Sequence, residues 1–177
     1  QVIRGENLVS NVTKLSEIRS SPSPIQSVDI KNVVSKTVEK IKNLFEHRKI
    51  IVQIPSQKFL VKANDLLQNA IENILFNAIM HNKNETIEIS IQALRYKINQ
   101  TPYIKIEFSD NGVGIPDTRK QEIFITREEE ESKFRTGLGL SLIKKIIEYY
   151  EGKIWVEDRI KGDHSKGSNF IILIPEA

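Results

Sequence analysis

The chain has 177 residues, of which 39% are hydrophobic and 28% charged, which suits one domain with a full apolar core and a soluble surface. It contains no cysteine, which excludes disulfides, cysteine-based zinc sites and thiol nucleophiles, and no apolar run near the roughly 20 residues that cross a bilayer. Lys and Arg total 26 against 23 Asp and Glu, and the basic residues are scattered, so nucleic-acid binding is not expected.

The first stretch predicts a short helix followed by a boundary. Leu8, Val12 and Leu15 are spaced by four and three residues, a narrow helical seam. The serines and prolines of residues 20–24 end it. The seam fits two readings equally: packing on its own domain, or the end of a larger helical element. Because the first residue is Gln1 rather than Met, we expect a fragment of a longer protein.

Helices and strands then alternate along the chain. Asp29 is the expected N-cap of an amphipathic helix that extends to about residue 49. Its apolar face is formed by Val33, Val34, Val38, Ile41, Leu44 and Phe45. Strands are expected at 50–54, 58–63, 86–94, 103–110, 153–158 and 169–175, with a second helix at 64–80 and a joining loop at 95–102. This order predicts an α+β fold in two layers, a mixed sheet with helices on one face.

A row of asparagines lies beside the apolar stripe of the second helix. Asn69, Asn73 and Asn77 recur every four residues. Asparagine inside a helix costs roughly half a kcal/mol relative to alanine, and the row fits either a solvated face or a ligand contact. Three in register favour a ligand, and an amide oxygen suits Mg²⁺, whose other ligands are commonly water and phosphate.

The strand of residues 103–110 ends at a carboxylate followed by two glycines. Asp110 offers an acceptor for an exocyclic amine such as that of adenine, and Gly112 and Gly114 let a flat ligand approach the backbone. The alternative interpretation is an ordinary Asp-Asn-Gly turn. A charged stretch follows at 116–136, and a loop of that length is typically a lid or disordered.

The next helix opens with glycines. Gly137 and Gly139 free backbone N–H groups to meet an anion, and the helix dipole favours negative charge there. Plain helix–strand packing is the alternative. Other phosphate motifs are excluded by their own residues, since Leu142 breaks a dinucleotide fingerprint and Ser168 replaces the lysine of a P-loop.

In this order and spacing, these stretches resemble the catalytic, ATP-binding domain of sensor histidine kinases, within the ATPase superfamily that includes gyrase and the mismatch-repair ATPases. Residues 66–82 resemble the N box, 110–115 the first glycine box, 123–124 the F box and 136–146 the second glycine box. The resemblance covers residues 25–177 and implies a Bergerat-type fold with a mobile ATP lid. It implies that residues 1–20 are the tail of a dimerisation hairpin helix and 21–24 a linker.

The resemblance also implies site roles, with ATP and Mg²⁺ as cofactors. Asn77 would bind Mg²⁺, Asn73 would contact phosphate or metal during catalysis, and Asp110 would hold the adenine amine. The other nucleotide-binding positions would be His81, Gly112, Gly114, Ile115, Phe124, Thr136, Gly137, Leu138 and Gly139. Met80 stands where the family often has lysine, and Arg135 of the lid is the expected catalytic substitute for that charge. His81 remains a candidate for stacking on adenine, although a plain surface histidine is the more common case.

The reaction is expected to be transfer of the ATP γ-phosphate to histidine. Hydrolytic members and serine kinases carry a glutamate at the position of Asn73, and Glu72 is turned about 100° away around the helix. A neutral imidazole needs positioning and charge neutralisation rather than a base. A superfamily ATPase, a serine kinase, and a degenerate module that binds nucleotide or only a partner remain as alternatives.

The resemblance implies the partners as well. None of the three histidines is followed by an acidic residue as the family's phosphoacceptor is, so that histidine is expected on a hairpin upstream of Gln1. The expected partners are this hairpin, a response regulator receiver domain and a second copy of the full-length protein. The expected location is cytoplasmic, in a soluble kinase or the inner part of a membrane-bound sensor, without direct membrane contact by this chain.

Overall fold

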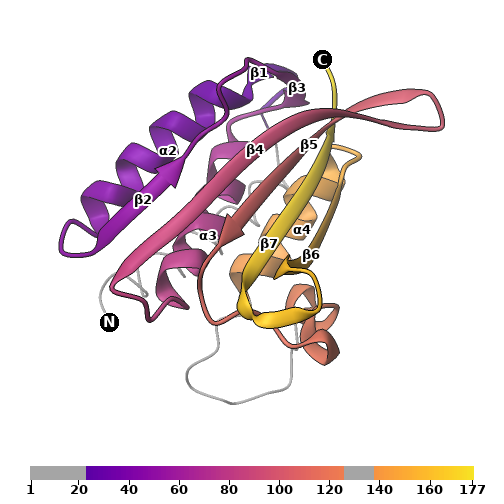
Figure 1. Ribbon diagram of the computed structural model, residues 1–177. Coiled ribbons are helices and arrows are strands. Elements are labelled where there is room, and N and C mark those ends of the chain that lie inside the picture. The colour runs from indigo at the N-terminus through magenta and orange to yellow at the C-terminus, as the bar shows by residue number, and fades with distance from the viewer. Residues whose placement is uncertain (1–22, 126–137) are drawn as a thin grey trace.

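The computed structural model describes residues 23–125 and 138–177 (Figure 1). Its helices are α2 (Ile30–Leu44), α3 (Leu66–Met80) and α4 (Leu138–Tyr149), with short 3₁₀ helices η1 (Asp117–Arg119) and η2 (Glu122–Phe124). Its strands are β1 (Gln26–Asp29), β2 (Lys49–Gln53), β3 (Leu60–Ala63), β4 (Thr86–Ile98), β5 (Thr101–Asp110), β6 (Lys153–Ile160) and β7 (Asp163–Pro175). The helix expected at residues 1–20 lies outside the described residues. Within the described residues, no helix is long and apolar enough to cross a membrane.

Five strands form a mixed sheet in the order β2-β4-β5-β7-β6. Strand β2 pairs parallel with β4, and the other neighbours pair antiparallel. The three α-helices cover one face of this sheet (Figure 1). A small antiparallel pair, β1 and β3, lies beside it. The predicted two-layer α+β architecture is therefore confirmed.

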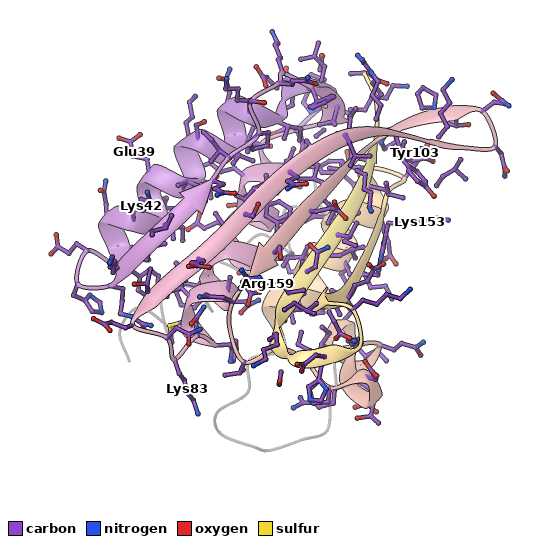
Figure 2. The ribbon with its side chains drawn as sticks, in the orientation of Figure 1. Glu39, Lys42, Lys83, Tyr103, Lys153 and Arg159 are labelled. Atoms are coloured by element: carbon purple, nitrogen blue, oxygen red, sulfur yellow. The ribbon has the colours of Figure 1, made fainter. Side chains whose placement is uncertain are left out.

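The core lies between the helices and the sheet. Alternate residues of the two long strands are buried on the helix side, namely Ile87, Ile89 and Ile91 of β4 and Ile104, Ile106 and Phe108 of β5. Asp29 caps α2 as expected, because its Oδ1 accepts a hydrogen bond from the Lys31 N–H at 2.9 Å. The outer face of the helix carries Glu39 and Lys42, which point into solvent (Figure 2).

Two details of the predicted α2 and β4–β5 elements were wrong. Leu44, expected on the buried face of α2, is 38% exposed because the helix ends there. The loop expected at 95–102 is strand except for a two-residue turn at Asn99 and Gln100, whose φ angles are 46° and 70°. Positive φ at both central residues gives a tight turn that matches strand twist, so β4 and β5 continue as a ribbon past the sheet (Figure 1).

Candidate nucleotide site

The asparagine row of α3 meets the first turn of α4. The Nδ2 of Asn73 donates to the backbone carbonyl of Asn69 at 2.9 Å, which fixes the amide orientation. Its Oδ1 then lies 3.4 Å from the position that a Cβ on Gly139 would occupy. All three asparagines of the row are half-buried. Two of the predicted stretches, far apart in the sequence, are thus in contact, and the glycine leaves open space between them.

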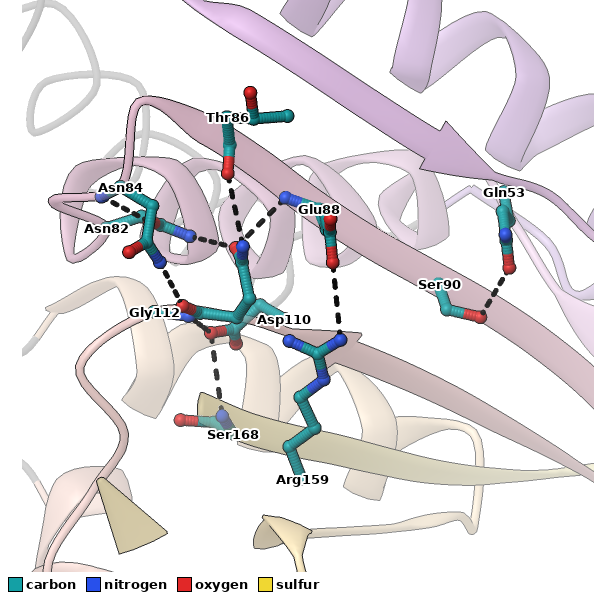
Figure 3. Close-up of polar contacts among 11 residues, drawn as sticks. Gln53, Asn82, Asn84, Thr86, Glu88, Ser90, Asp110, Gly112, Arg159 and Ser168 are labelled. Atoms are coloured by element: carbon teal, nitrogen blue, oxygen red, sulfur yellow. Dashed lines mark hydrogen bonds and ion pairs between the residues drawn. The ribbon is translucent and has the colours of Figure 1, made fainter. Parts of the chain in front are cut away.

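Asp110 ends β5 as a buried carboxylate. It is 5% exposed, and its Oδ1 accepts hydrogen bonds from the backbone N–H groups of Gly112 at 2.7 Å and Ser168 at 3.5 Å (Figure 3). Burial raises the pKa of Asp110 from its ordinary value of 3.8 to about 6, while the two N–H donors and the charge of Arg159 lower it in part. The group is therefore an ionised acceptor at neutral pH in a place poor in water, suited to an amine donor.

Glycines let the backbone close tightly around this carboxylate. A Cβ on Gly112 would lie 2.8 Å from Asp110 Oδ1 and 2.9 Å from the carbonyl oxygen of His81. Gly114 has φ +70°, and a Cβ there would lie 1.5 Å from the carbonyl oxygen of His164. Only glycine fits at these two positions without a backbone shift. The loop after β5 can therefore lie directly against the C-terminal end of α3.

Backbone contacts confirm that the helix end and this loop are adjacent. The N–H of Val113 donates to the carbonyl of His81, which is the C-cap of α3, at 3.2 Å. The His81 side chain is exposed. Asn77 lies one turn before it on the same helix. Helix α3 consequently links the α4 glycine turn, next to Asn73, with the loop that follows Asp110 (the Asp110 loop).

A cluster of side-chain amides surrounds the contact between the C-terminal end of α3 and the loop after β5. The sequence analysis did not predict it. It consists of Asn82, Asn84 and Asn111, which bond to one another and to the start of β4. Arg48, from the α2–β2 connection, donates through Nη2 to the carbonyls of Asn82 at 3.0 Å and Asn84 at 3.4 Å. Two asparagines just after the α3 asparagine row, and a third inside the Asp-Asn-Gly segment, were the available signal.

The remaining predicted site residues divide between core and undescribed parts. Phe124 is buried and meets Phe170 of β7 edge-on at 6.2 Å between ring centroids, so it is anchored in the core. Ile115 is half-buried against the same core. Leu138 and Gly139 begin α4. The other three predicted positions, Arg135, Thr136 and Gly137, lie outside the described residues.

Glu72 faces a different neighbour from the asparagine row. Its two carboxylate oxygens accept from the Nζ of Lys40, on α2, at 2.8 and 2.9 Å. Helix α3 packs against α2 on one side and α4 on the other (Figure 1). Asn73 faces α4, whereas Glu72 faces α2. The carboxylate is thus engaged away from the predicted phosphate side of the helix.

Comparison with families and sequences of known proteins gives consistent matches. A profile of histidine kinase-, DNA gyrase B- and HSP90-like ATPases matches residues 62–177. The adaptive-response sensory kinase SasA of Synechocystis sp. is 34% identical over 116 residues, covering 63% of this chain and 28% of SasA. The phytochrome-like protein Cph1 of Synechocystis sp. is 25% identical over 176 residues, covering 96% of this chain and 22% of Cph1. The chain thus spans less than a third of the length of either relative.

Solved structures share the fold at lower sequence identity. The mycobacterial sensor histidine kinase MprB superimposes with a TM-score of 0.70 at 20% identity, covering 86% of this chain and 97% of that one. Full-length ShkA in complex with AMPPNP gives a TM-score of 0.75 at 19% identity, covering 96% of this chain and 35% of ShkA. At these identities the likeness establishes a common fold.

Proposed function

Because this chain belongs to the family of histidine kinase-, DNA gyrase B- and HSP90-like ATPases, and is therefore an ATP-binding domain, we propose that it is the catalytic domain of a sensor histidine kinase. It would transfer the γ-phosphate of ATP to a histidine on a dimerisation hairpin. One observation carries the proposal: α3 contacts the α4 glycine turn through Asn73 and the Asp110 loop through its C-terminal end. One helix thereby borders both the first turn of α4, which would bind an anion, and the Asp110 carboxylate, which would accept an amine.

The adenine end would be built around Asp110. Its buried, ionised carboxylate accepts the exocyclic amine, and the bare backbone at Gly112 and Gly114 leaves space for the ring. Ile115 would offer apolar contact to the base. The exposed ring of His81, at the C-terminal end of α3, would be available to stack on it. The site would favour adenine because guanine presents a carbonyl oxygen, an acceptor, at the matching position.

The phosphate end would be built around the first turn of α4. Backbone N–H groups at Leu138 and Gly139, together with Thr136, Gly137 and the side chain of Arg135, would hold the phosphates at a helix N-terminus. Phe124 would anchor the lid that carries Arg135, Thr136 and Gly137, through its contact with Phe170.

The asparagine row fits a magnesium ion. Amide oxygens are hard ligands, and the Asn73 amide is fixed with its nitrogen bonded to Asn69, so its oxygen is directed toward α4. Asn77 would ligate the ion and Asn73 would contact phosphate or metal. When bound, Mg²⁺ would neutralise charge on the phosphates.

The position of Glu72 supports transfer to an imidazole over hydrolysis. A hydroxyl or water nucleophile needs a base, and the carboxylate of Glu72 is ion-paired with Lys40 on the side of α3 that faces α2. An imidazole carries its own lone pair, so positioning and charge neutralisation suffice.

In the full-length protein, the proposed partners are the histidine hairpin of its own chain, a second copy, and a response regulator receiver domain. The proposed location is the cytoplasm.

Phosphate transfer to a separately prepared hairpin tests the proposal. The chain is incubated with γ-labelled ATP, Mg²⁺ and the histidine hairpin of its parent protein, and acid-labile phosphate on the hairpin is expected. Binding of ATP without such phosphate contradicts the transfer reaction. Steady hydrolysis that Glu72→Gln abolishes would instead identify an ATPase or a serine kinase.

A metal-dependence measurement tests the magnesium assignment. Asn77→Ala should weaken nucleotide binding in the presence of Mg²⁺ more than in its absence, because only the metal-dependent part uses the amide oxygen. Titration calorimetry with ADP, with and without Mg²⁺, gives the two losses. Equal losses would remove Asn77 from the metal role.

A further inference from the structure

Asn111 joins the end of β5 to two other elements through its side chain. Its Oδ1 accepts from the Nδ2 of Asn82 at 2.7 Å and from the backbone N–H of Glu88 at 2.9 Å. Its Nδ2 donates to the backbone carbonyl of Thr86 at 3.1 Å (the partners Asn82, Thr86 and Glu88 are labelled in Figure 3). Asn111 stands between Asp110 and Gly112, so these bonds fix the backbone that aims the carboxylate.

Asn82 is held equally firmly at the end of α3. It is 4% exposed, and its Oδ1 accepts from the backbone N–H of Asn84 at 3.0 Å. Its carbonyl accepts from Arg48, and Asn84 in turn donates through Nδ2 to the carbonyl of Asn111. The Asn82–Asn111 bond therefore connects a fixed helix end with a fixed strand end.

These side chains are engaged within the protein rather than offered to a ligand. Both the oxygen and the nitrogen of the Asn111 amide bond to other residues of the chain, and so do those of Asn82. The bonds bridge residues 29 and 25 positions apart in the sequence. Their effect on a bound nucleotide would pass through the placement of Asp110 relative to α3.

We propose that Asn111 and Asn82 are positioning residues that hold the adenine acceptor Asp110 at a fixed place relative to α3, and so set the affinity and selectivity for adenine nucleotides. The inference rests on the proposed function, since it concerns the same site. It adds two residues that would not touch the nucleotide, and it requires that loosening them reduces the preference for adenine over guanine.

The other end of α3 supplies a matched control. Asn64 is 2% exposed, its Oδ1 accepts from the Tyr150 hydroxyl at 2.5 Å and from the Leu66 N–H at 3.1 Å, and its Nδ2 donates to the Ser23 carbonyl at 2.6 Å. It is the same residue type, as buried as Asn82 and similarly bonded, at the end of α3 away from Asp110. A purely structural role at Asn111 predicts that both substitutions behave alike.

The experiment compares Asn111→Ala, Asn82→Ala and Asn64→Ala in the chain as it stands. Urea unfolding gives the stability of each, and calorimetry with ADP and with GDP gives affinity and selectivity. All three should be destabilised. Asn111→Ala and Asn82→Ala should bind ADP about tenfold more weakly and lose a similar factor in ADP-over-GDP preference, as expected for a misplaced charged hydrogen bond. Asn64→Ala should change both by less than about twofold.

The outcomes separate the inference from its premise. Unchanged ADP affinity and preference in Asn111→Ala, or an equal loss in Asn64→Ala, would overturn the positioning role while leaving the proposed function intact. Failure of the unaltered chain to bind ADP would overturn the proposed function itself. Should Asn111→Ala not fold, Asn82→Ala decides, because it removes one bond to Asn111 Oδ1 and leaves the bond from Glu88 in place.

Discussion

Buried asparagines form hydrogen-bonded clusters at both ends of helix α3, but the two clusters differ in what they adjoin. At the N-terminal end, Asn64 and the Tyr150 hydroxyl form a closed set of hydrogen bonds that ties α3 to the end of α4. At the C-terminal end, Asn82 and Asn111 form a similar set, but it adjoins the buried carboxylate Asp110. The first set contains only neutral groups. The second adjoins a charge.

The difference lies in what burial does to the titrating group. Burial raises the pKa of the Tyr150 hydroxyl, which therefore stays protonated and donates to Asn64 throughout the neutral range. Burial also raises the pKa of Asp110, but there it opposes the charged form that the proposed adenine contact would require at neutral pH. One end stabilises the fold, and under the proposed function the other would give up stability for a ligand, a balance common at functional sites.

The largest expected effect is on nucleotide binding at the C-terminal end. Asp110→Ala should reduce ADP affinity by at least about 100-fold, because it removes the carboxylate proposed to accept the adenine amine. The variant should still unfold cooperatively. Asp65→Ala, at an exposed position beside the N-terminal end of α3, serves as the control and should bind ADP normally. Normal ADP binding by Asp110→Ala would remove the functional half of the comparison.

A pH effect on stability should follow from the same carboxylate. Between about pH 4 and 6 the folded chain keeps a proton on Asp110 that the unfolded chain releases, so the free energy of unfolding falls as pH rises through this window. The move from 3.8 to about 6 corresponds to about 3 kcal/mol, lost in full above pH 6. Asp110→Asn should lack this loss.

Urea unfolding of both proteins at several pH values measures the effect. Other groups titrate in both proteins and cancel in the difference between them, which should grow from pH 4 to pH 7 in favour of Asp110→Asn. A difference that stays constant across the range would mean that burial of Asp110 carries no energetic cost.

A smaller effect is expected at the N-terminal end. Tyr150→Phe removes the hydroxyl that donates to Asn64 Oδ1, which leaves a buried acceptor with fewer partners and should cost about 1 to 2 kcal/mol of unfolding free energy. ADP affinity should be unchanged, because this end of α3 lies away from Asp110. Calorimetry on the folded variant decides; a loss of ADP affinity would show that the two ends are coupled.

The smallest effect is expected on the side of α3 that faces α2. Glu72→Gln breaks the ion pair with Lys40, which is partly exposed, and should cost less than about 1 kcal/mol. Histidine phosphorylation should proceed at the same rate, as measured by acid-labile phosphate on the hairpin. Lys40→Met is the matched variant, since it breaks the same pair and leaves the carboxylate in place.

The sequence predicted those parts of the fold that local patterns determine. Period-two alternation marked Ile104, Ile106 and Phe108 as buried, and the position of Asp29 before an amphipathic run marked a helix cap. Strand β1 was missed because four residues without strong alternation do not distinguish a strand from a linker. The Asn99–Gln100 turn was missed because Gln gives little local signal for positive φ.

The site was predicted in its parts rather than in its connections. The meeting of Asn73 with Gly139, and of the Asp110 loop with α3, was inferred only through resemblance, and the structure brings these residues together. The Asn82–Asn111 bond was not anticipated. It joins residues 29 apart, and no helical or strand period relates them. Such pairs become visible only when the strand order is known.

The strand order also governs when this domain can finish folding. The late strand β7 lies between β5 and β6, so one edge of β5 remains unpaired until residues near Pro175 have been synthesised. On the ribosome, β4 and β5 can pair early through their two-residue turn. The second neighbour of β5, strand β7, begins more than fifty residues later in the chain, so that pairing forms late. Shortening β7 at its far end would expose the middle of the sheet rather than its margin.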